Sequence, residues 1–339
     1  MTAGLFFTPL LYAAQLECNT GIADITPDEP VSLAGFAARV GLSTSTHRPL
    51  KTHCLVIQKD TTRVCIITND MMEISIDLSR KLRDEIAEKT GISYNHIFIH
   101  CTHTHSAPRT GGKSVEQGGT NVAFAAKFRE TIVSNAVQTA NNKKAFIPFT
   151  IETAKGSSDI NCNRGESDGP CDHDVYVARL LDKKGKPIVS FLNFACHPVS
   201  LNHKSLVVST DFPGIAREEL SKTWNSNVFY VAGPAGNVDP CGPLRADTAY
   251  TRSRGIELAD AVRNIQFNKL QKNNVLQISN VEVRLPFRAA NITPALINRH
   301  ADEIKDWDPF GTWKNDVERW RAATLEKIAN GKVKNYLPV

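Results

Sequence analysis

The stretch HCLVIQKDTTRVCIITND, residues 53–70, decides the fold class, because it holds two apolar runs separated by a polar turn. Both runs are rich in β-branched residues and apolar throughout, which is typical of strands buried on both faces. A helical pattern follows over Asp77–Lys89, and a further strand is expected over His96–Cys101. This alternation of strands and helices predicts an α/β protein.

The same alternation continues along the rest of the chain. Further strands are expected over Phe149–Thr153, Val175–Leu181, Ile188–Ala195, Asn227–Val231 and Val275–Leu285. Helices with apolar residues at three- and four-residue spacing are expected over Asn121–Asn141, Pro213–Trp224, Thr251–Leu270, Pro294–Trp307 and Lys314–Asn330. Neither an internal repeat nor a Pro/Ser-rich linker divides the chain. We therefore expect a single large domain over residues 19–339, with mixed, largely buried β-sheets flanked by helices.

The composition excludes several classes of protein. Hydrophobic residues make up 41% of the chain and charged residues 22%, which is ordinary for a globular protein and rules out disordered or collagenous chains. The 40 Lys and Arg exceed the 35 Asp and Glu by five without forming a dense basic run, which argues against nucleic-acid binding. After the first residues, no apolar run approaches the roughly 20 residues that cross a bilayer.

The two ends of the chain suggest a leader peptide and an incomplete domain. Residues 1–18 include an apolar stretch of the length of a secretory signal core, but without a preceding Lys or Arg, so we interpret them as a degenerate leader. This favours a secreted or periplasmic protein, with a cytoplasmic location as the alternative. The last residues, 332–339, resemble the start of another strand, so we expect the domain to be incomplete at this end. The sequence does not determine an oligomeric state.

The eight cysteines are too sparse for a disulfide scaffold. Four of them lie within apolar, strand-like runs and are expected to be packed thiols: Cys54, Cys65, Cys101 and Cys196. Cys162 and Cys171 flank a polar Gly/Pro loop instead, and they could close a short disulfide in an oxidising compartment.

The densest chemical signal is HIFIHCTHTHSAPRTGG, residues 96–112, which places four of the ten histidines within ten residues. His103 and His105 are two apart, so in extended backbone both imidazoles project to the same side at the carboxyl end of a buried strand. This arrangement suits one metal ion, although a pair of hydrogen-bonded histidines is an equal alternative. His96 and His100 alternate with Ile97 and Ile99, and we interpret them as structural.

A second candidate ligand is His197 in NFACHPVSL, where an apolar strand again breaks into a turn. Neutral imidazoles at a hydrolytic site favour zinc, and a catalytic zinc usually takes three protein ligands. Asp70, Asp211 and Asp239 follow strands or lie in turns, so each could be a ligand, a base, a histidine orienter or a helix cap.

Two glycine-containing turns, STDFPG (209–214) and VAGPAGNVDPCG (231–242), can expose backbone N–H groups near such a site. The second turn lacks the lysine and hydroxyl of a phosphate-binding loop, which argues against nucleotide binding.

Six motifs, in order, resemble those of the neutral/alkaline non-lysosomal ceramidase family. They are GIADITPDEPVSLAGFAAR (21–39), CTHTHSAP (101–108), NCNR (161–164), FACHPVSL (194–201), STDFPG (209–214) and GNVDP (236–240). Members of this family are zinc amidases that split an N-acyl amide, so the resemblance implies a small-molecule amide or lipid-like substrate such as ceramide. It also implies that His103 and His197 bind zinc, and that His105 and Arg164 contact the substrate or its oxyanion.

Two departures from the family pattern affect the assignment. The family's GDVSP motif carries a serine thought to assist attack on the amide, whereas this chain has Asp239 at that position. Asp239 could act as a base, as a general acid or as an inert substitute. The family's other zinc ligands, a glutamate and a tyrosine, lie downstream of the region matched here.

The sequence therefore supports one leading hypothesis, a zinc-dependent hydrolase of an amide bond with His105, Arg164 and Asp239 as catalytic residues. A catalytically inert ligand-binding homologue is the second hypothesis, and a related metal-dependent hydrolase or esterase of another substrate is the third.

Overall fold

The computed structural model describes residues 15–36, 38–111, 121–270, 275–281, 284–286, 292–307, 314–332 and 336–338. The chain divides into two compact units, a large one over Met1–Gly35 with Gly41–Ile278, and a small one over Phe36–Val40 with Ser279–Val339. The α/β class with mixed sheets flanked by helices is confirmed. The expected leader lies mostly outside the described residues, and the expected division at residues 18 and 19 stays a prediction.

The large unit contains two five-stranded sheets of mixed direction. The first has the order β5-β4-β3-β1-β6, with β1 Glu17–Asp24, β3 Lys51–Lys59, β4 Thr62–Asn69, β5 Ile97–Cys101 and β6 Ile147–Pro148. The second has the order β12-β10-β9-β7-β14, with β7 Thr150–Ser157, β9 Asp174–Leu181, β10 Pro187–Phe194, β12 Asn227–Ala232 and β14 Asn268–Lys269. Two short pairs, β2 Ser45–Thr46 with β11 Val207–Val208 and β8 Asn161–Asn163 with β13 Val238–Pro240, complete the unit's sheets.

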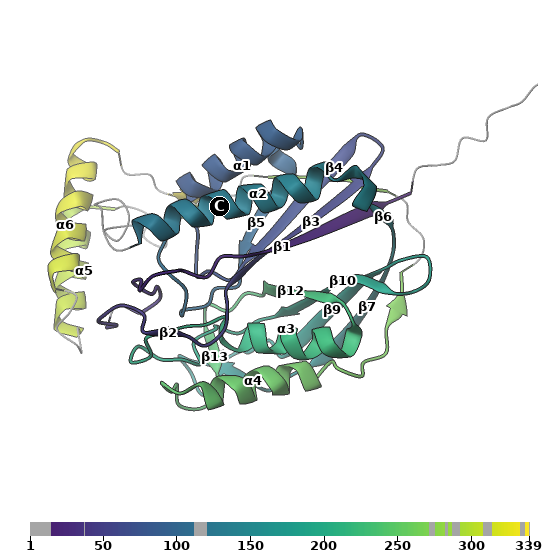
Figure 1. Ribbon diagram of the computed structural model, residues 1–339. Coiled ribbons are helices and arrows are strands. Elements are labelled where there is room, and N and C mark those ends of the chain that lie inside the picture. Colours follow the sequence, from purple (N-terminus) through teal and green to yellow (C-terminus); the bar gives the residue numbers. More distant parts are fainter. Residues whose placement is uncertain are drawn as a thin grey trace, which may run out of the picture. The chain divides into compact units, whose positions relative to one another are not determined.

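Helices cover one face of each sheet, and the other faces pack together. Figure 1 shows α1 (Ile76–Thr90) and α2 (Val122–Asn141) beside the first sheet, and α3 (Asp211–Trp224) and α4 (Thr248–Asp260) beside the second. Alternate residues of a strand serve the two faces, as the two-residue period requires. In β3, Cys54 and Val56 face the helices, whereas Leu55 packs against Phe229 of the second sheet.

The two sheets repeat the same arrangement. In each, three antiparallel strands are followed by a helix and a strand that pairs in parallel: β4 with β5 across α1, and β10 with β12 across α3. A further helix follows each parallel pair, α2 after β5 and α4 after β12. We call the first sheet with α1 and α2 the first half of the large unit, and the second sheet with α3 and α4 the second half. Sequence patterns gave no sign of this repeat, because the two halves share the order of their strands and helices but not a repeated pattern of residues.

A buried cluster of polar side chains lies between elements of the two halves. Arg217 of α3 donates to Asp70 Oδ2 at 2.7 Å, just after β4, and to His53 Nε2 of β3 at 3.0 Å. All three residues are at most 7% exposed. Removing one member of a buried ion pair leaves an uncompensated charge, which makes such a pair costly to break.

The small unit contains the helices α5 (Pro294–Trp307) and α6 (Lys314–Ala329) and the antiparallel pair β15 (Arg284–Pro286) with β16 (Tyr336–Pro338). Ile297 and Ala301 of α5 and Val317 of α6 are its buried apolar residues among those described.

Most expected elements are present, and two are wrong in extent. Among the described residues of the strand expected over Val275–Leu285, only the last two form a strand, as part of β15. Residues 275–281 have no strand partner, and Val275 and Val281 are more than 60% exposed. The helix expected to reach Leu270 ends at Asp260. Beyond that residue the chain turns, Phe267 packs against Trp224, and β14 joins the second sheet.

The pKa of His53 is held well below its usual value by burial, with Arg217 and Lys51 lowering it further. The unfolded chain therefore binds a proton below about pH 6.5 that the folded chain does not, so His53 lowers stability as the pH falls below that value. We predict that His53→Gln, which keeps an acceptor for Arg217, reduces the slope of the unfolding free energy against pH by up to about 1.4 kcal/mol per pH unit below pH 6.5. Urea unfolding at several pH values measures the slope, and an unchanged slope would contradict the assignment.

Candidate metal centre

His103 and His105 follow β5 at the carboxyl end of the parallel pair of the first sheet. The expected extended backbone is wrong at this point, because His103 has a φ of 68°, in the left-handed region. Its N–H donates to Met71 O at 2.9 Å. The two rings nevertheless meet, with Nε2 atoms 3.4 Å apart, because the left-handed residue turns the chain between them.

His197 follows β10 at the carboxyl end of the parallel pair of the second sheet, as the sequence predicted. Its backbone N–H donates to Val238 O at 2.9 Å. The ring Nδ1 lies 2.7 Å from Ala235 O, and Ala235 lies just beyond β12. In the first half, His103 Nδ1 lies 2.9 Å from Met72 O, just beyond β4. Each ring is thus held by a carbonyl that follows the neighbouring parallel strand.

These two hydrogen bonds fix the ring protons. A carbonyl oxygen can only accept, so both Nδ1 atoms must donate, and in the neutral rings both Nε2 atoms carry lone pairs. His103 Nε2 and His197 Nε2 are 3.0 Å apart. Two lone pairs at this distance do not attract each other. A cation between them, or a proton on one of them, satisfies both.

The three histidines fit a metal ion. One ring nitrogen each of His103, His105 and His197 can be chosen so that the three atoms lie within 4.8 Å of one another. Two ligands of a tetrahedral zinc, with Zn–N bonds of about 2.0–2.1 Å, are about 3.3 Å apart. The distances of 3.0 and 3.4 Å from His103 Nε2 to the other two Nε2 atoms match this separation. Carbonyl support at the second ring nitrogen is also typical of metal-binding histidines.

The surroundings of His197 favour the neutral ring. Burial lowers its pKa, and the nearby His103 and Arg164 lower it further, against the opposing effects of the Ala235 carbonyl and Asp239. The residue is 8% exposed. A neutral imidazole is the form that binds a metal, so protons compete less with a cation here than at an exposed histidine.

Arg164, which directly follows β8, and Asp239 of β13 lie beside His197. Asp239 Oδ1 is 3.9 Å from His197 Nδ1 and 3.6 Å from the Arg164 guanidinium. This oxygen is buried and accepts no hydrogen bond from the described residues. The Arg164 side chain is about half exposed. The structure thus brings together all five residues that the sequence singled out for the site.

The other polar residues considered as candidates make hydrogen bonds within the fold and lie outside the histidine cluster. Asp70 pairs with Arg217, and Asp211 accepts from the Ser200 hydroxyl and the Phe212 N–H at the start of α3. His96 bonds the carbonyl of Arg63 and His100 accepts from the N–H of Ala232, in agreement with their structural interpretation.

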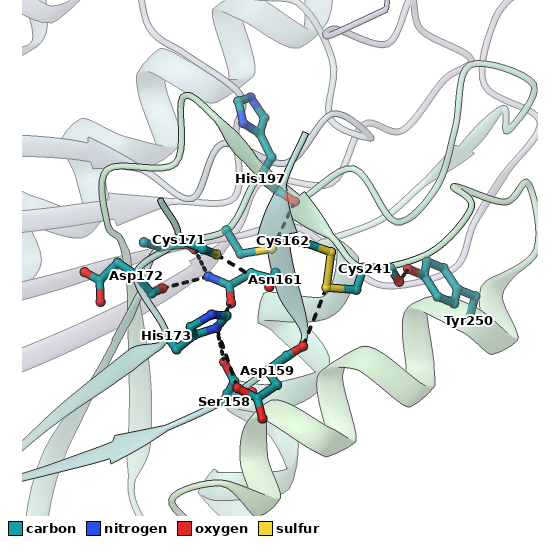
Figure 2. The surroundings of a disulfide bond; sticks show 12 residues. Ser158, Asp159, Asn161, Cys162, Cys171, Asp172, His173, His197, Cys241 and Tyr250 are labelled. Atoms are coloured by element: carbon teal, nitrogen blue, oxygen red, sulfur yellow. Dashed lines mark hydrogen bonds and ion pairs between the residues drawn. A yellow bond between two sulfur atoms is a disulfide. The ribbon is translucent and has the colours of Figure 1, made fainter. Parts of the chain in front are cut away.

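Cys162 and Cys171, which the sequence left as a possible disulfide, are not bonded to each other. Cys162 pairs with Cys241 instead, and Figure 2 shows this bond between the two short strands. The reason is the register of β8 and β13, which pairs Asp239 with Cys162 and so brings Cys241, two residues further along, to a Cα–Cα distance of 5.2 Å from Cys162. Cys171 is a free thiol that donates to Asn161 O at 3.5 Å. Cys54, Cys65, Cys101 and Cys196 are also free thiols, as predicted.

Sequence reasoning missed the groups that hold the rings. The carbonyls of Met72 and Ala235 belong to the backbone, which carries no residue signature. Gly35 has a φ of 98°, and a Cβ there would lie 2.3 Å from His105 Cγ. Gly35 belongs to the motif GIADITPDEPVSLAGFAAR, but its contact with His105 joins segments that are distant in sequence, so the motif alone did not reveal it.

The family model for the neutral/alkaline non-lysosomal ceramidase N-terminal region matches residues 17–235. Neutral ceramidase A of Dictyostelium discoideum is 25% identical over 221 residues, which are 59% of this chain and 31% of the relative. Neutral ceramidase of Oryza sativa subsp. japonica is 24% identical over 229 residues, 61% of this chain and 29% of the relative. The chain spans about a third of the length of these relatives.

The fold is also similar to that of a solved protein. Neutral ceramidase from Pseudomonas aeruginosa superposes with a TM-score of 0.66 at 17% identity, over 84% of this chain and 50% of that one. Fold and site together define an α/β protein with a histidine cluster that could bind a metal. The chain belongs to the neutral/alkaline non-lysosomal ceramidase family. Among the described helices, none is both long and apolar enough to cross a membrane.

Gly35→Ala tests how tightly the backbone is packed against His105. An alanine at positive φ costs about 1–2 kcal/mol, and the clash with the imidazole adds to this cost and displaces the ring. Gly41→Ala is the matched control, because Gly41 has a φ of 99° but its Cβ would meet nothing closer than 3.4 Å. We expect the Gly35 variant to lose more unfolding free energy in urea and to shift the His105 imidazole NMR signals. Equal losses and an unshifted signal would refute the contact.

Proposed function

We propose that this chain is the catalytic region of a zinc-dependent hydrolase that splits an N-acyl amide, with a ceramide-like lipid as substrate. The observation that carries the proposal is the convergence of His103 Nε2 and His197 Nε2, at 3.0 Å, in a member of the ceramidase family. The names of the relatives support the amide and the lipid. The Cys162–Cys241 disulfide supports an oxidising compartment, and hence a secreted or periplasmic protein.

His103 and His197 are the proposed metal ligands, because backbone carbonyls hold both rings with Nε2 directed at the same point. Zinc held there would polarise the amide carbonyl and lower the pKa of water toward about 7. His105 lies at the side of this pair, where its ring can donate to the substrate oxygen. A third ligand role for His105 is the alternative, and metal binding by its variant distinguishes the two.

Arg164 and Asp239 are the other two proposed catalytic residues, one for the oxyanion and one for proton transfer. The half-exposed Arg164 guanidinium can turn toward a developing oxyanion, where a charged donor stabilises negative charge. Asp239 Oδ1 is buried without a hydrogen-bond donor, which suits a group that accepts a proton from water during attack. The carboxylate would then take the position of the serine in the family motif.

A second candidate function is ligand binding without turnover. One observation favours it: Asp239 lies 3.6 Å from the Arg164 guanidinium, so the carboxylate absent from the family motif engages the arginine that would face the oxyanion. Such a site could still bind a polar amide. Activity measurements separate the two candidates.

The metal assignment predicts about one zinc per chain after loading and dialysis. His103→Ala and His197→Ala should each abolish this binding, because either change leaves a single supported imidazole. His105→Ala should retain zinc while losing activity. Exposed His300→Ala is the control. Elemental analysis and competition with a chelating dye measure the binding. A wild-type chain without zinc would refute the metal centre, and loss of zinc in His105→Ala would make His105 a third ligand.

The hydrolase assignment predicts release of fatty acid from N-acylsphingosine by the zinc-loaded chain. Asp239→Asn should lower kcat by about 10²–10⁴-fold, since an amide cannot accept the proton. Asp77→Asn, at an exposed position on α1, is the control. Chromatography of released fatty acid measures the rate, alongside a panel of simple N-acyl amines and esters. Binding of N-acylsphingosine without turnover of any panel member would overturn the hydrolase in favour of the binding protein.

A further inference from the structure

We propose that the Cys162–Cys241 disulfide is a positioning element of the histidine cluster. It holds β8 and the end of β13 together as a two-stranded ribbon. Hydrogen bonds from both strands to the segment that carries His197 then keep that ring directed at His103. The inference rests on the proposed metal centre for its binding readout, and a second readout in the metal-free chain tests the positioning itself.

The ribbon is too short to be stable alone. β8 and β13 contain three residues each, and two-stranded hairpins are only marginally stable in water. Backbone hydrogen bonds join its two ends, from Arg164 N to Asn237 O at 2.9 Å and from Cys241 N to Ile160 O at 2.7 Å. The disulfide adds a covalent link between residues 79 apart in sequence. It is thus the strongest connection between the two strands.

Both strands of the ribbon hold the segment around His197. From β8, the buried Asn161 donates through Nδ2 to Ala195 O at 2.7 Å. From β13, Val238 O accepts the backbone N–H of His197 at 2.9 Å. In Figure 2, Asn161 and the disulfide lie close together with His197 above them. A shift of either strand therefore moves the backbone on which the imidazole stands.

The ribbon also determines the ring's orientation. Val238 N donates to Ala235 O at 3.2 Å, and the same carbonyl accepts from His197 Nδ1 at 2.7 Å. The turn before β13 thus presents its oxygen to the imidazole. Asp239 and Arg164 leave the same ribbon beside the ring. One covalent bond consequently supports His197, its hydrogen-bond acceptor and both neighbouring charges.

Replacement of both cysteines tests the proposal in the full chain. The variant Cys162→Ser with Cys241→Ser should raise the Kd for Zn²⁺ by about 10–100-fold, the usual effect of losing support behind a metal ligand. Cys171→Ser is the matched control, because it changes a sulfur in the same loop region without breaking the disulfide. Its Kd should equal that of the wild type. An unchanged Kd in the double variant would overturn the proposal.

A destabilised variant separates positioning from general loss of stability. Leu220→Ala removes a fully buried side chain from the core between α3 and the second sheet, at a distance in sequence from the ribbon. It should lower Tm while leaving the Kd for Zn²⁺ unchanged. An increase in Kd as large as that of the double variant at a similar Tm would show that stability alone controls binding, against the proposal.

The metal-free chain provides the independent readout. Imidazole ¹⁵N NMR should show His197 as a single Nδ1–H tautomer in the wild type and in Cys171→Ser, and a tautomer mixture in the double variant. Should the wild type bind no zinc, the metal centre fails, and this spectrum still decides the role of the disulfide. Identical His197 signals in wild type and double variant would refute it.

Discussion

The arrangement of the site depends on two hydrogen bonds from imidazole Nδ1 atoms to backbone carbonyls. Because Met72 O and Ala235 O can only accept, they fix the protons of His103 and His197 on the outer nitrogens. The inner nitrogens then face each other at 3.0 Å as two lone pairs. A cation placed between them would relieve this conflict.

The repeated architecture explains why the two halves meet at this point. The carboxyl ends of parallel strands lie at the same edge of a sheet. In many α/β proteins, the loops at this edge carry the residues that bind ligands. β4 with β5 and β10 with β12 form such an edge in each sheet. Each half provides one imidazole whose Nδ1 bonds a backbone carbonyl, and the Arg217–Asp70 ion pair joins elements of the two halves. The site therefore needs both sheets.

The sequence predicted those parts of the fold that depend on local patterns. Apolar runs located β3, β4, β10 and β12. The spacing of His103 and His105, and the place of His197 after a strand, indicated the histidine cluster. Local patterns could not predict contacts between segments that are distant in sequence. The residues ECNTGIAD gave no clear strand pattern, although β1 lies within the first sheet because β3 pairs with it. The partner of Cys162 depended on the register of β13, which no spacing along the loop reveals.

The order of the cysteines has a consequence for biosynthesis. During translation, Cys162 and Cys171 leave the ribosome together, and Cys241 follows only after β9, β10 and α3. In an oxidising environment the nearer thiol is available first, and closing a short loop costs less entropy than closing a long one. A transient bond between Cys162 and Cys171 would then have to be exchanged for the native one, a step that takes seconds to hours and is catalysed by isomerases. Recombinant yield of this chain should accordingly depend on the host's capacity for thiol exchange.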